Sequence, residues 1–397
     1  TTATGLAAHP INLSPIGTSA YQLGALRADA NVVREVELRA APTYRARPEA
    51  DTSPYALDPV SFVLFDDFEA AQNALASGAV DTLAATTPAE REGLFLLSNN
   101  AGLDVYNQIE NRLGALIFNW QNPDKPYFRD QRTRVALQAA LDRPAIIERV
   151  MANSAVPADS PILPGSWAYL ADMPWAAYDP ALARALIQQA ADRVERVNAA
   201  GQDAPTAIPD SGQVAPGADP TATPTEAPPP AVVFEFSILV PDDPVLVALA
   251  QEIAAQWSQV GVTALVATAS PEDFRQRLDN GEFDTAIVEM GLGSSADPDV
   301  YDFWHQGQYP DGENVSGVDD RQISILLERA RRDPYGVNRV QDYAAFQREF
   351  AQRAIALPLY YPLFTFVAEP RVQGVQLGFM GQPADRFRNI GDWSLQN

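Results

Sequence analysis

The clearest pattern of apolar and polar positions lies in the middle of the chain, at Leu113–Pro164. Its first residues, Leu113–Trp120, are almost all apolar, which predicts a buried strand. A polar turn with two prolines follows. Asp130 then precedes an apolar stripe at helical spacing and is predicted to cap a helix, because its carboxylate can accept from free N–H groups of the first turn. A second helix is predicted to start at Asp142, with proline in its first turn, where a missing N–H costs nothing.

Shorter patterns before this segment predict strands and a helix. Val32–Arg39 alternates apolar and polar residues, as a half-buried strand does, and Pro59–Phe65 has the composition of a second strand. Asp66 or Asp67 would cap a helix that ends at Gly78. Because Ala79–Leu83 is again strand-like, the order strand, helix, strand predicts an α/β lobe with parallel pairing.

The second half of the chain predicts alternating strands and helices. The predicted strands are Val232–Val240, Val262–Thr268 and Phe283–Met290, with an extended segment at Ile355–Ala368. The predicted helices are Ala181–Val197, Pro244–Val260, a helix capped by Ser270, Asp319–Arg332 and Asn338–Ala354.

The composition changes abruptly at Gly201–Ala231. This stretch holds eight prolines in 31 residues, and it has no aromatic residue and no lysine or arginine. Such a segment cannot bury enough apolar surface to offset the entropy of ordering it. It is predicted to be a disordered Pro/Thr/Ala-rich insertion, and the alternative is an extended segment that docks a partner.

Length and charge limit the class of protein. A chain of 397 residues predicts two lobes or more. The net charge of −23, from 51 acidic and 28 basic residues, argues against a nucleic-acid partner and against adsorption to an anionic membrane. No apolar run approaches 18 residues, so no segment of the chain is predicted to insert in a membrane.

Few residues are available for catalysis, so the chain is predicted not to be an enzyme and to need no cofactor. Cysteine is absent, which excludes disulfides, thiolate metal sites and cysteine nucleophiles. The two histidines, His9 and His305, lie far apart in the sequence, and no G-x-S-x-G or phosphate-loop motif occurs. Paired carboxylates such as Asp297 and Asp299 leave a hydrolase as a minor alternative, although such aspartates more often form turns or caps.

Several motifs in a fixed order resemble the family 5 extracellular solute-binding proteins, the receptors of peptide and nickel ABC importers. The strongest is Leu113–Pro164, with a strand ending in Phe-Asn, a proline turn and an Asp-x-x-x-Arg helix. The other matching segments are Pro15–Tyr21, Ala41–Tyr44, Phe65–Asp81, Tyr178–Pro180, Gly281–Asp284, Asp297–Asp299, Phe303–His305 and Arg371–Val375.

The resemblance implies a fold. It is α/β, periplasmic-binding-protein-like type II, with two lobes, mixed sheets and an incomplete first lobe. Residues 1–112 and 366–397 would form the partial first lobe, and 113–365 the second. Family members usually carry roughly 150–200 further residues before the first motif, the size of a small domain. The chain is therefore expected to be the C-terminal two-thirds of such a receptor.

The resemblance also implies a function. The chain would be the substrate-binding component of an ABC importer, capturing peptides or peptide-like solutes in an inter-lobe cleft without catalysis. Its partners would be the solute and the permease subunits. Its location would be extracytoplasmic, periplasmic or at the cell surface, with a lipid anchor in the full-length protein. The alternative is a sensory or adhesion module that reuses the binding fold.

Candidate ligand-binding residues are aromatic or polar residues at strand ends and in the loops that follow. Trp120 could equally be core, Asp297 could serve only its turn, and His305 could be a packed helix residue. Family peptide receptors often place an aspartate four residues before the D-P proline, and this chain has Ser294 there. The candidates are Asn119, Trp120, Trp167, Met290, Asp297, Trp304, His305 and Asn314.

Overall fold

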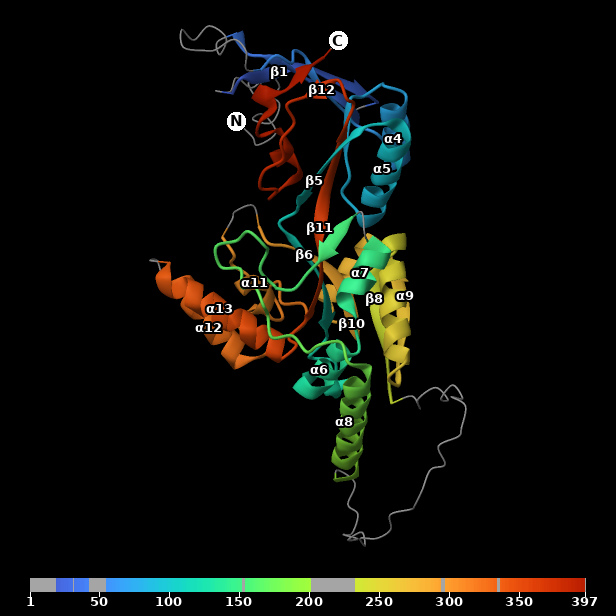
Figure 1. The fold of residues 1–397 in the computed structure, drawn as a ribbon, viewed down its shortest axis with the longest axis vertical. Coiled ribbons are helices and arrows are strands. Elements are labelled where there is room, and N and C mark those ends of the chain that lie inside the picture. Colours follow the sequence, from blue (N-terminus) through green and yellow to red (C-terminus); the bar gives the residue numbers. More distant parts are fainter. Residues whose placement is uncertain are drawn as a thin grey trace, which may run out of the picture.

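The computed structural model describes residues 19–30, 32–42, 55–151, 154–200, 233–293, 297–333 and 336–396, without the side chains of 194–200. The predicted insertion at Gly201–Ala231 lies outside the described residues, as does Ser294. Figure 1 shows two lobes stacked along the long axis of the molecule. The long strand β11 (Leu357–Ala368) runs from one lobe into the other. The two-lobed α/β architecture is thus confirmed, and the exact lobe boundaries stay a prediction.

The first lobe carries a small antiparallel sheet with the strand order β1-β2-β3. Its strands are β1 (Tyr21–Asp29), β2 (Val32–Ala40) and β3 (Val60–Val63), so both strands predicted in this region are confirmed. The expected parallel pairing is wrong. β3 pairs antiparallel with β2, whereas β4 (Thr82–Ala84) pairs antiparallel with β11 in another sheet.

The reason lies in the helix between β3 and β4. In a parallel strand-helix-strand unit, the helix packs on the sheet that holds both strands. Here α4 (Phe68–Ala76) instead packs beside β4 and α5 (Pro88–Ala101), and β3 stays with its hairpin partner. Thr87 and Glu90 form a capping box at the start of α5, where each side chain accepts from the other residue's backbone N–H.

The large sheet holds the described part of the molecule together. Its strand order is β4-β11-β6-β10-β8-β9, and β5 and β7 pair with β11 outside this path. Among the described strands, β8 pairs in parallel with β9 and β10, whereas β6 is antiparallel to both β10 and β11. The strands are β5 (Asp104–Ile109), β6 (Arg112–Phe118), β7 (Ala155–Pro157), β8 (Phe234–Pro241), β9 (Val262–Ala269) and β10 (Thr285–Gly291).

Helices cover the second lobe's part of this sheet (Figure 1). Two of the predicted caps are confirmed: Asp130 accepts from the Arg132 N–H, and Ser270 accepts from the Asp273 N–H. The helices are α6 (Gln131–Ala139), α7 (Arg143–Met151), α8 (Pro180–Ala200), α9 (Pro244–Ser258), α10 (Pro271–Asp279), α11 (Tyr301–Trp304), α12 (Arg321–Arg332) and α13 (Val337–Gln352).

Short elements complete the described chain. The 3-10 turns η3 (Pro383–Phe387) and η4 (Ile390–Asp392) lie between the paired strands β12 (Val372–Gln373) and β13 (Ser394–Leu395). The turns η1 (Pro126–Arg129) and η2 (Gln306–Gln308) precede helices in the second lobe. No helix among the described residues is both long and apolar enough to cross a bilayer.

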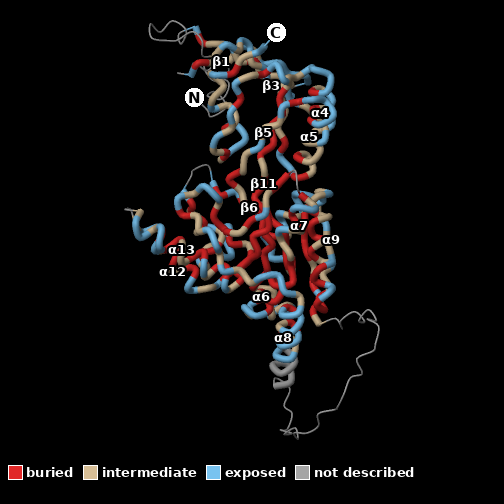
Figure 2. Tube along the Cα trace, viewed as in Figure 1, coloured by how far each residue is buried: buried red, intermediate tan, exposed pale blue. Residues whose placement is uncertain are grey.

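The main core lies in the second lobe, around β6, β10 and the first half of β11 (Figure 2). One close approach in it depends on glycine. Gly114 on β6 faces the ring of Tyr360 on β11, and a Cβ at Gly114 would overlap that ring. The tyrosine is fully buried and lies where the two lobes meet, so this contact supports the junction itself.

Candidate functional site

Three cavities adjoin the loop after β10; one lies in the second lobe, and two are lined from both lobes. We call them the β10 cavity, the hinge cavity and the interlobe cavity, with volumes of about 450, 460 and 290 Å³. Gly291 and Gly293 line both the β10 and the hinge cavity, Leu292 lines the β10 and the interlobe cavity, and Asn111 lines the hinge and the interlobe cavity. The three cavities are therefore neighbours around one loop, and we treat them together as the candidate site. Their size is typical of ligand pockets.

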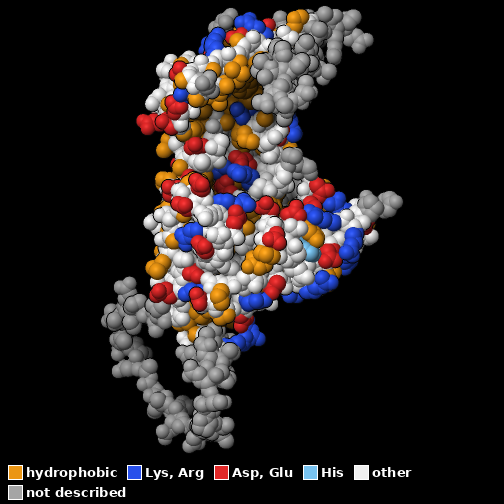
Figure 3. All heavy atoms as spheres, turned by 180° about the vertical axis from the view of Figure 1, so that it is seen from behind, with side chains coloured by type: hydrophobic (Ala, Val, Ile, Leu, Met, Phe, Trp, Pro, Cys, Tyr) orange, Lys and Arg blue, Asp and Glu red, His pale blue; other side chains and the backbone are white. Residues whose placement is uncertain are grey.

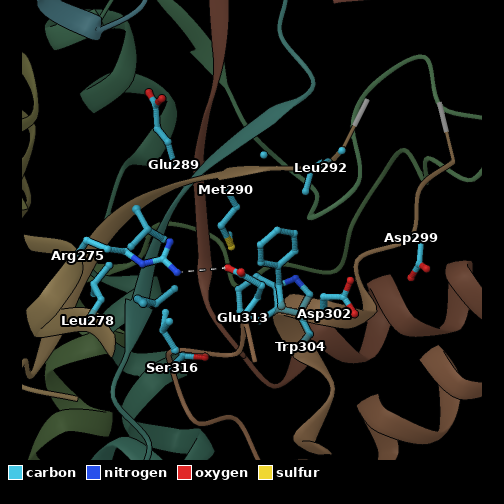
Figure 4. A pocket seen from close by; sticks show the side chains of 16 residues that line it. Arg275, Leu278, Glu289, Met290, Leu292, Asp299, Asp302, Trp304, Glu313 and Ser316 are labelled. Carbon is cyan, nitrogen blue, oxygen red and sulfur yellow. Dashed lines mark ion pairs between the residues drawn. The ribbon is translucent and has the colours of Figure 1, made fainter. Parts of the chain in front are cut away.

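The β10 cavity has an apolar floor and a charged rim (Figure 4). Met290 points into it from the end of β10, and Trp304 of α11 closes it below. Arg275 of α10 and Glu313 of the loop after η2 face each other across its opening, with a separation of 3.9 Å between Nη2 and Oε2. The remaining lining residues are Ile117, Leu278, Val288, Glu289, Gly291, Leu292, Gly293, Asp299, Asp302, Phe303, Val315 and Ser316.

The interlobe cavity is lined from both lobes. Ile109 at the end of β5 and Phe379 form its first-lobe side. The loop Ile162–Ser166, Leu292 and the turn Asp297–Pro298 form its second-lobe side. A solute in this cavity would contact both lobes at once. Most of its lining is apolar, which suits hydrocarbon or aromatic groups.

Asn111 joins the β5–β6 turn to the loop after β10. Its backbone N–H donates to the Met380 carbonyl and its carbonyl accepts from the Leu292 N–H, both at 2.9 Å. Its side-chain amide donates to the Gly293 carbonyl at 2.6 Å. Gly293 has φ of +87°, a left-handed conformation that favours glycine. One residue therefore fixes the position of the loop on which all three cavities depend.

Buried charges support the same junction. The Arg91 side chain is 0% exposed, and its guanidinium contacts Glu110 at 3.2 Å and Glu289 at 3.3 Å. Arg112 contacts Glu289 at 3.3 Å, and the Tyr360 hydroxyl donates to the same carboxylate at 3.1 Å. These five residues come from α5, the β5–β6 turn, β6, β10 and β11, and so from both lobes. Figure 3 shows acidic and basic side chains side by side at the narrow part of the molecule between the lobes.

Burial shapes the protonation of this cluster. Loss of hydration raises the pKa of Glu110, although Arg91 opposes the shift. Burial also raises the pKa of Tyr360 well above its usual value, and the nearby Glu289 adds to this. The tyrosine hydroxyl therefore keeps its proton and acts as a donor.

Sequence reasoning missed the charged cluster because its members are far apart along the chain. Arg91 and Glu289, for example, are 198 positions apart. One signal was available: Glu289 is the only charged residue in the apolar strand β10. An isolated carboxylate in a buried strand requires a partner, since an unpaired buried charge is costly.

Four of the predicted ligand-binding residues lie at or beside the candidate site. Met290 and Trp304 line the β10 cavity, and Asp297 lines the interlobe cavity. The Asp297 carboxylate also accepts two hydrogen bonds from Arg339, at 2.8 and 3.1 Å. Trp167 follows the loop that lines the interlobe cavity, is 45% exposed, and lies with its ring 5.1 Å from the same guanidinium.

Asn119 and Trp120 lie at the opposite end of β6. The Asn119 amide donates to the carbonyls of Gly281 and Phe283, at 3.0 and 2.9 Å. Trp120 is buried beneath the guanidinium of Arg134, which is 3.8 Å from the centre of the ring. Neither residue lines the three cavities. This placement favours the interpretation of Trp120 as core.

His305 and Asn314 also lie outside the three cavities. The His305 ring stacks on Tyr301 with 4.1 Å between the ring centres, and its Nε2 lies 3.1 Å from Glu328 Oε1. The buried Asn314 amide donates to the carbonyls of His305 and Val318. These contacts favour the reading of His305 as a packed residue. Within the described ranges, no group of three or more His, Cys, Asp or Glu residues could hold a metal ion.

Two α/β lobes joined by a shared strand, with cavities gathered at their junction, are the features of the periplasmic-binding-protein-like fold of type II. A match over residues 5–312 identifies the family, described as bacterial extracellular solute-binding proteins, family 5 Middle. The chain belongs to this family, and the resemblance noted from its motifs is confirmed.

Relatives and solved structures agree with this assignment. The dipeptide-binding protein of Escherichia coli K12 is 24% identical over 383 residues, which cover 96% of this chain and 62% of the relative. The ABC transporter substrate-binding protein CtaP from Listeria monocytogenes superposes with a TM-score of 0.73 at 21% identity, covering 98% of this chain and 68% of that one.

A third similarity is to DppA from Helicobacter pylori, solved in complex with the peptide STSA. It has a TM-score of 0.65 and 19% identity, covering 100% of this chain and 68% of that one. At these identities the solved structures establish the fold. The chain spans about three fifths of the length of the curated relatives that it matches.

Proposed function

We propose that the chain captures peptides or peptide-like solutes between its lobes and delivers them to an ABC importer, without catalysis. The observation that carries this proposal is the grouping of three cavities around the loop after β10, two of which are lined by residues of both lobes. Binding there would favour a closed arrangement of the lobes, because only that arrangement makes the contacts from both sides.

The names of the relatives support a peptide ligand. The Escherichia coli relative is a dipeptide-binding protein, and the Helicobacter pylori structure holds a peptide. The same proposal includes the permease subunits of an importer as partners. It also includes an extracytoplasmic location, with a lipid anchor in the full-length protein. The family description, as extracellular solute-binding proteins, supports the location.

The chemistry of the site supports binding rather than catalysis. Glu289, Glu110, Arg91 and Arg112 contact one another, so their charges neutralise each other instead of activating a nucleophile. The apolar lining of the interlobe cavity offers contact area to a solute. Paired charges and an apolar lining suit a receptor, because a receptor must bind its solute and release it unchanged.

Calorimetric titration with a panel of dipeptides and tripeptides tests the proposal. We expect saturable one-to-one binding of at least one peptide, with the peptide recovered intact. A Leu292→Trp variant should weaken that binding at least tenfold, because a larger side chain at Leu292 would fill space in two of the cavities.

Leu265→Trp is the matched control. Leu265 lies on β9, is 55% exposed and lines none of the three cavities. It should bind peptides as the native chain does. If no peptide binds, or if peptides are cleaved during the titration, the proposed function is wrong.

A further inference from the structure

A further cavity lies in the first lobe, and we call it the first-lobe cavity. Its volume is about 620 Å³, and residues of β3, β4, β11 and the C-terminal turns η3 and η4 border it. Among the described residues it shares only Thr86 and Pro383 with the hinge cavity. The proposed capture of a peptide between the lobes does not use this cavity.

The lining of the first-lobe cavity is mostly apolar. Phe366 and Trp393 are buried beside it. Val63, Leu64 and Leu395 also line it and are 41%, 50% and 48% exposed. Figure 3 shows hydrophobic side chains gathered on the surface of the first lobe. Such a concentration of exposed apolar side chains around a cavity is typical of a binding site.

One cation interrupts this apolar lining. The guanidinium carbon of Arg386, in η3, lies 4.2 Å from the ring centre of Phe387 and 6.0 Å from that of Phe366. Its Nη1 donates to the Pro383 carbonyl, and its buried Nε has no hydrogen-bond partner among the described residues. Burial lowers the pKa of Arg386 to about 10, and no carboxylate of the described chain opposes this shift.

The nearest acidic residues along the chain and in the lining are engaged elsewhere. Asp385, next to Arg386, pairs with Arg388 at 3.1 Å. Asp81, the one acidic residue in the described lining, pairs with Arg371. The positive charge of Arg386 is therefore left uncompensated at the wall of an apolar cavity, which is costly unless an anion joins it.

We infer that the first-lobe cavity binds an anionic amphiphile, a carboxylate on an unbranched hydrocarbon chain such as a fatty acid. The chain would lie against the apolar side chains of β3 and β4, and the carboxylate would accept hydrogen bonds from Arg386. One negative head on a long apolar body matches a single cation in an apolar cavity, whereas a peptide would bring unpaired backbone polar groups into it.

The source of the amphiphile follows from the charge of the whole chain. A net charge of −23 opposes adsorption to an anionic bilayer, so the ligand is the free acid and not a lipid within a membrane. This inference goes beyond the proposed function and does not rest on it.

Calorimetry with decanoate and the uncharged 1-decanol tests the inference. The native chain should bind one decanoate per chain, about tenfold more tightly than decanol. Dodecanoate has two more methylenes and should bind about tenfold more tightly than decanoate, because those methylenes are also buried. A saturating peptide should leave the affinity for decanoate unchanged.

Two variants of Arg386 test its role. Arg386→Gln should abolish the preference for the acid by weakening decanoate and leaving decanol unchanged, and Arg386→Lys should keep the preference because it keeps the charge. Arg388→Gln is the matched control: Arg388 is two positions away, carries the same charge and does not line the cavity. It should keep the preference, and circular dichroism of each variant without ligand should match the native chain.

The other outcomes contradict the inference. It is wrong if the native chain binds decanoate and decanol equally, if Arg386→Gln keeps the preference, or if a peptide displaces decanoate. It is also wrong if the chain sediments with phosphatidylglycerol vesicles without binding decanoate, or if no amphiphile binds because a second copy or another polypeptide segment fills the cavity. Failure of every peptide to bind would overturn the proposed function alone and leave this inference standing.

Discussion

At the residue scale, the junction of the lobes depends on contacts between residues that are distant in sequence. Gly114 is one of them, because the fully buried ring of Tyr360 occupies the space of a side chain there. We predict that Gly114→Ala lowers the free energy of unfolding by about 2 kcal/mol, the usual cost of forcing extra volume into a packed core. Urea unfolding followed by tryptophan fluorescence measures this.

Gly378→Ala is the control for that change, because a Cβ at Gly378 would meet no atom within 4 Å. It should leave the unfolding midpoint close to that of the native chain. Equal effects of the two substitutions would show that Tyr360 does not fill the space above Gly114.

The buried charges give a second prediction at this scale. Glu289→Gln keeps the shape of the side chain but leaves Glu110 alone to balance Arg91 and Arg112. We expect the free energy of unfolding to fall by about 3 kcal/mol, because the buried Arg91 loses one of its two carboxylate partners. The measurement is the same urea titration.

Glu252→Gln serves as the comparison, since Glu252 pairs with Arg149 on the surface. An exposed pair contributes less than about 1 kcal/mol, so this variant should differ little from the native chain. A similar loss of stability in both variants would mean that the buried cluster at the junction contributes no more to stability than the surface pair does.

At the scale of elements, local signals predicted the helices and non-local pairing decided the sheets. Helix caps are set by residues two or three positions apart, which is why Asp130 and Ser270 were identified correctly. β3 instead pairs with β2, the strand before it. β4 pairs with β11, which lies almost 300 positions later. No pattern within β3 or β4 contains that information, so the parallel pairing expected there was wrong.

The same contrast holds for the candidate site. Met290 and Trp304 were predicted from their places at a strand end and in the following loop, and both line the β10 cavity. Asn119 and Trp120 were chosen for the same reason, but they follow the end of β6 that points away from the junction. The sequence shows where a strand ends, and it does not show which end meets the other lobe.

The start of α4 tests whether a single side chain sets the beginning of a helix. Asp66 and Asp67 were equal candidates for the cap of α4, and the structure selects Asp67, which accepts from the Ala70 N–H at 2.8 Å. Asp67→Ala should destabilise α4 by about 1 kcal/mol, which corresponds to roughly fivefold faster hydrogen exchange of its amides. Asp66→Ala, which removes only an exposed pair with Arg34, should change exchange much less. The reverse order would show that Asp66 is the cap.

At the scale of the whole molecule, the contacts between the lobes differ on the two sides of the shared strands. On one side α5 and α9 are in contact, and the Ala89 N–H at the start of α5 donates to Asp243, which caps α9. On the other side lies the interlobe cavity, between Phe379 and the loop that follows β7. A hinge at the packed side and an opening at the cavity side predict that a bound solute closes the lobes on the cavity side.

The absence of cysteine from the chain makes this closure measurable, because each introduced cysteine carries a label at a unique position. Ala384→Cys with Val337→Cys places labels in the two lobes at exposed positions, one in η3 and one at the start of α13. We expect the distance between these labels, measured by double electron–electron resonance, to shorten when a peptide that binds is added. The control pair, Leu96→Cys with Gln251→Cys, lies on α5 and α9 at the packed side, where the distance should change much less. If both distances stay constant while calorimetry shows saturable binding, the solute is held by a rigid junction, and its binding energy does not depend on movement of the lobes.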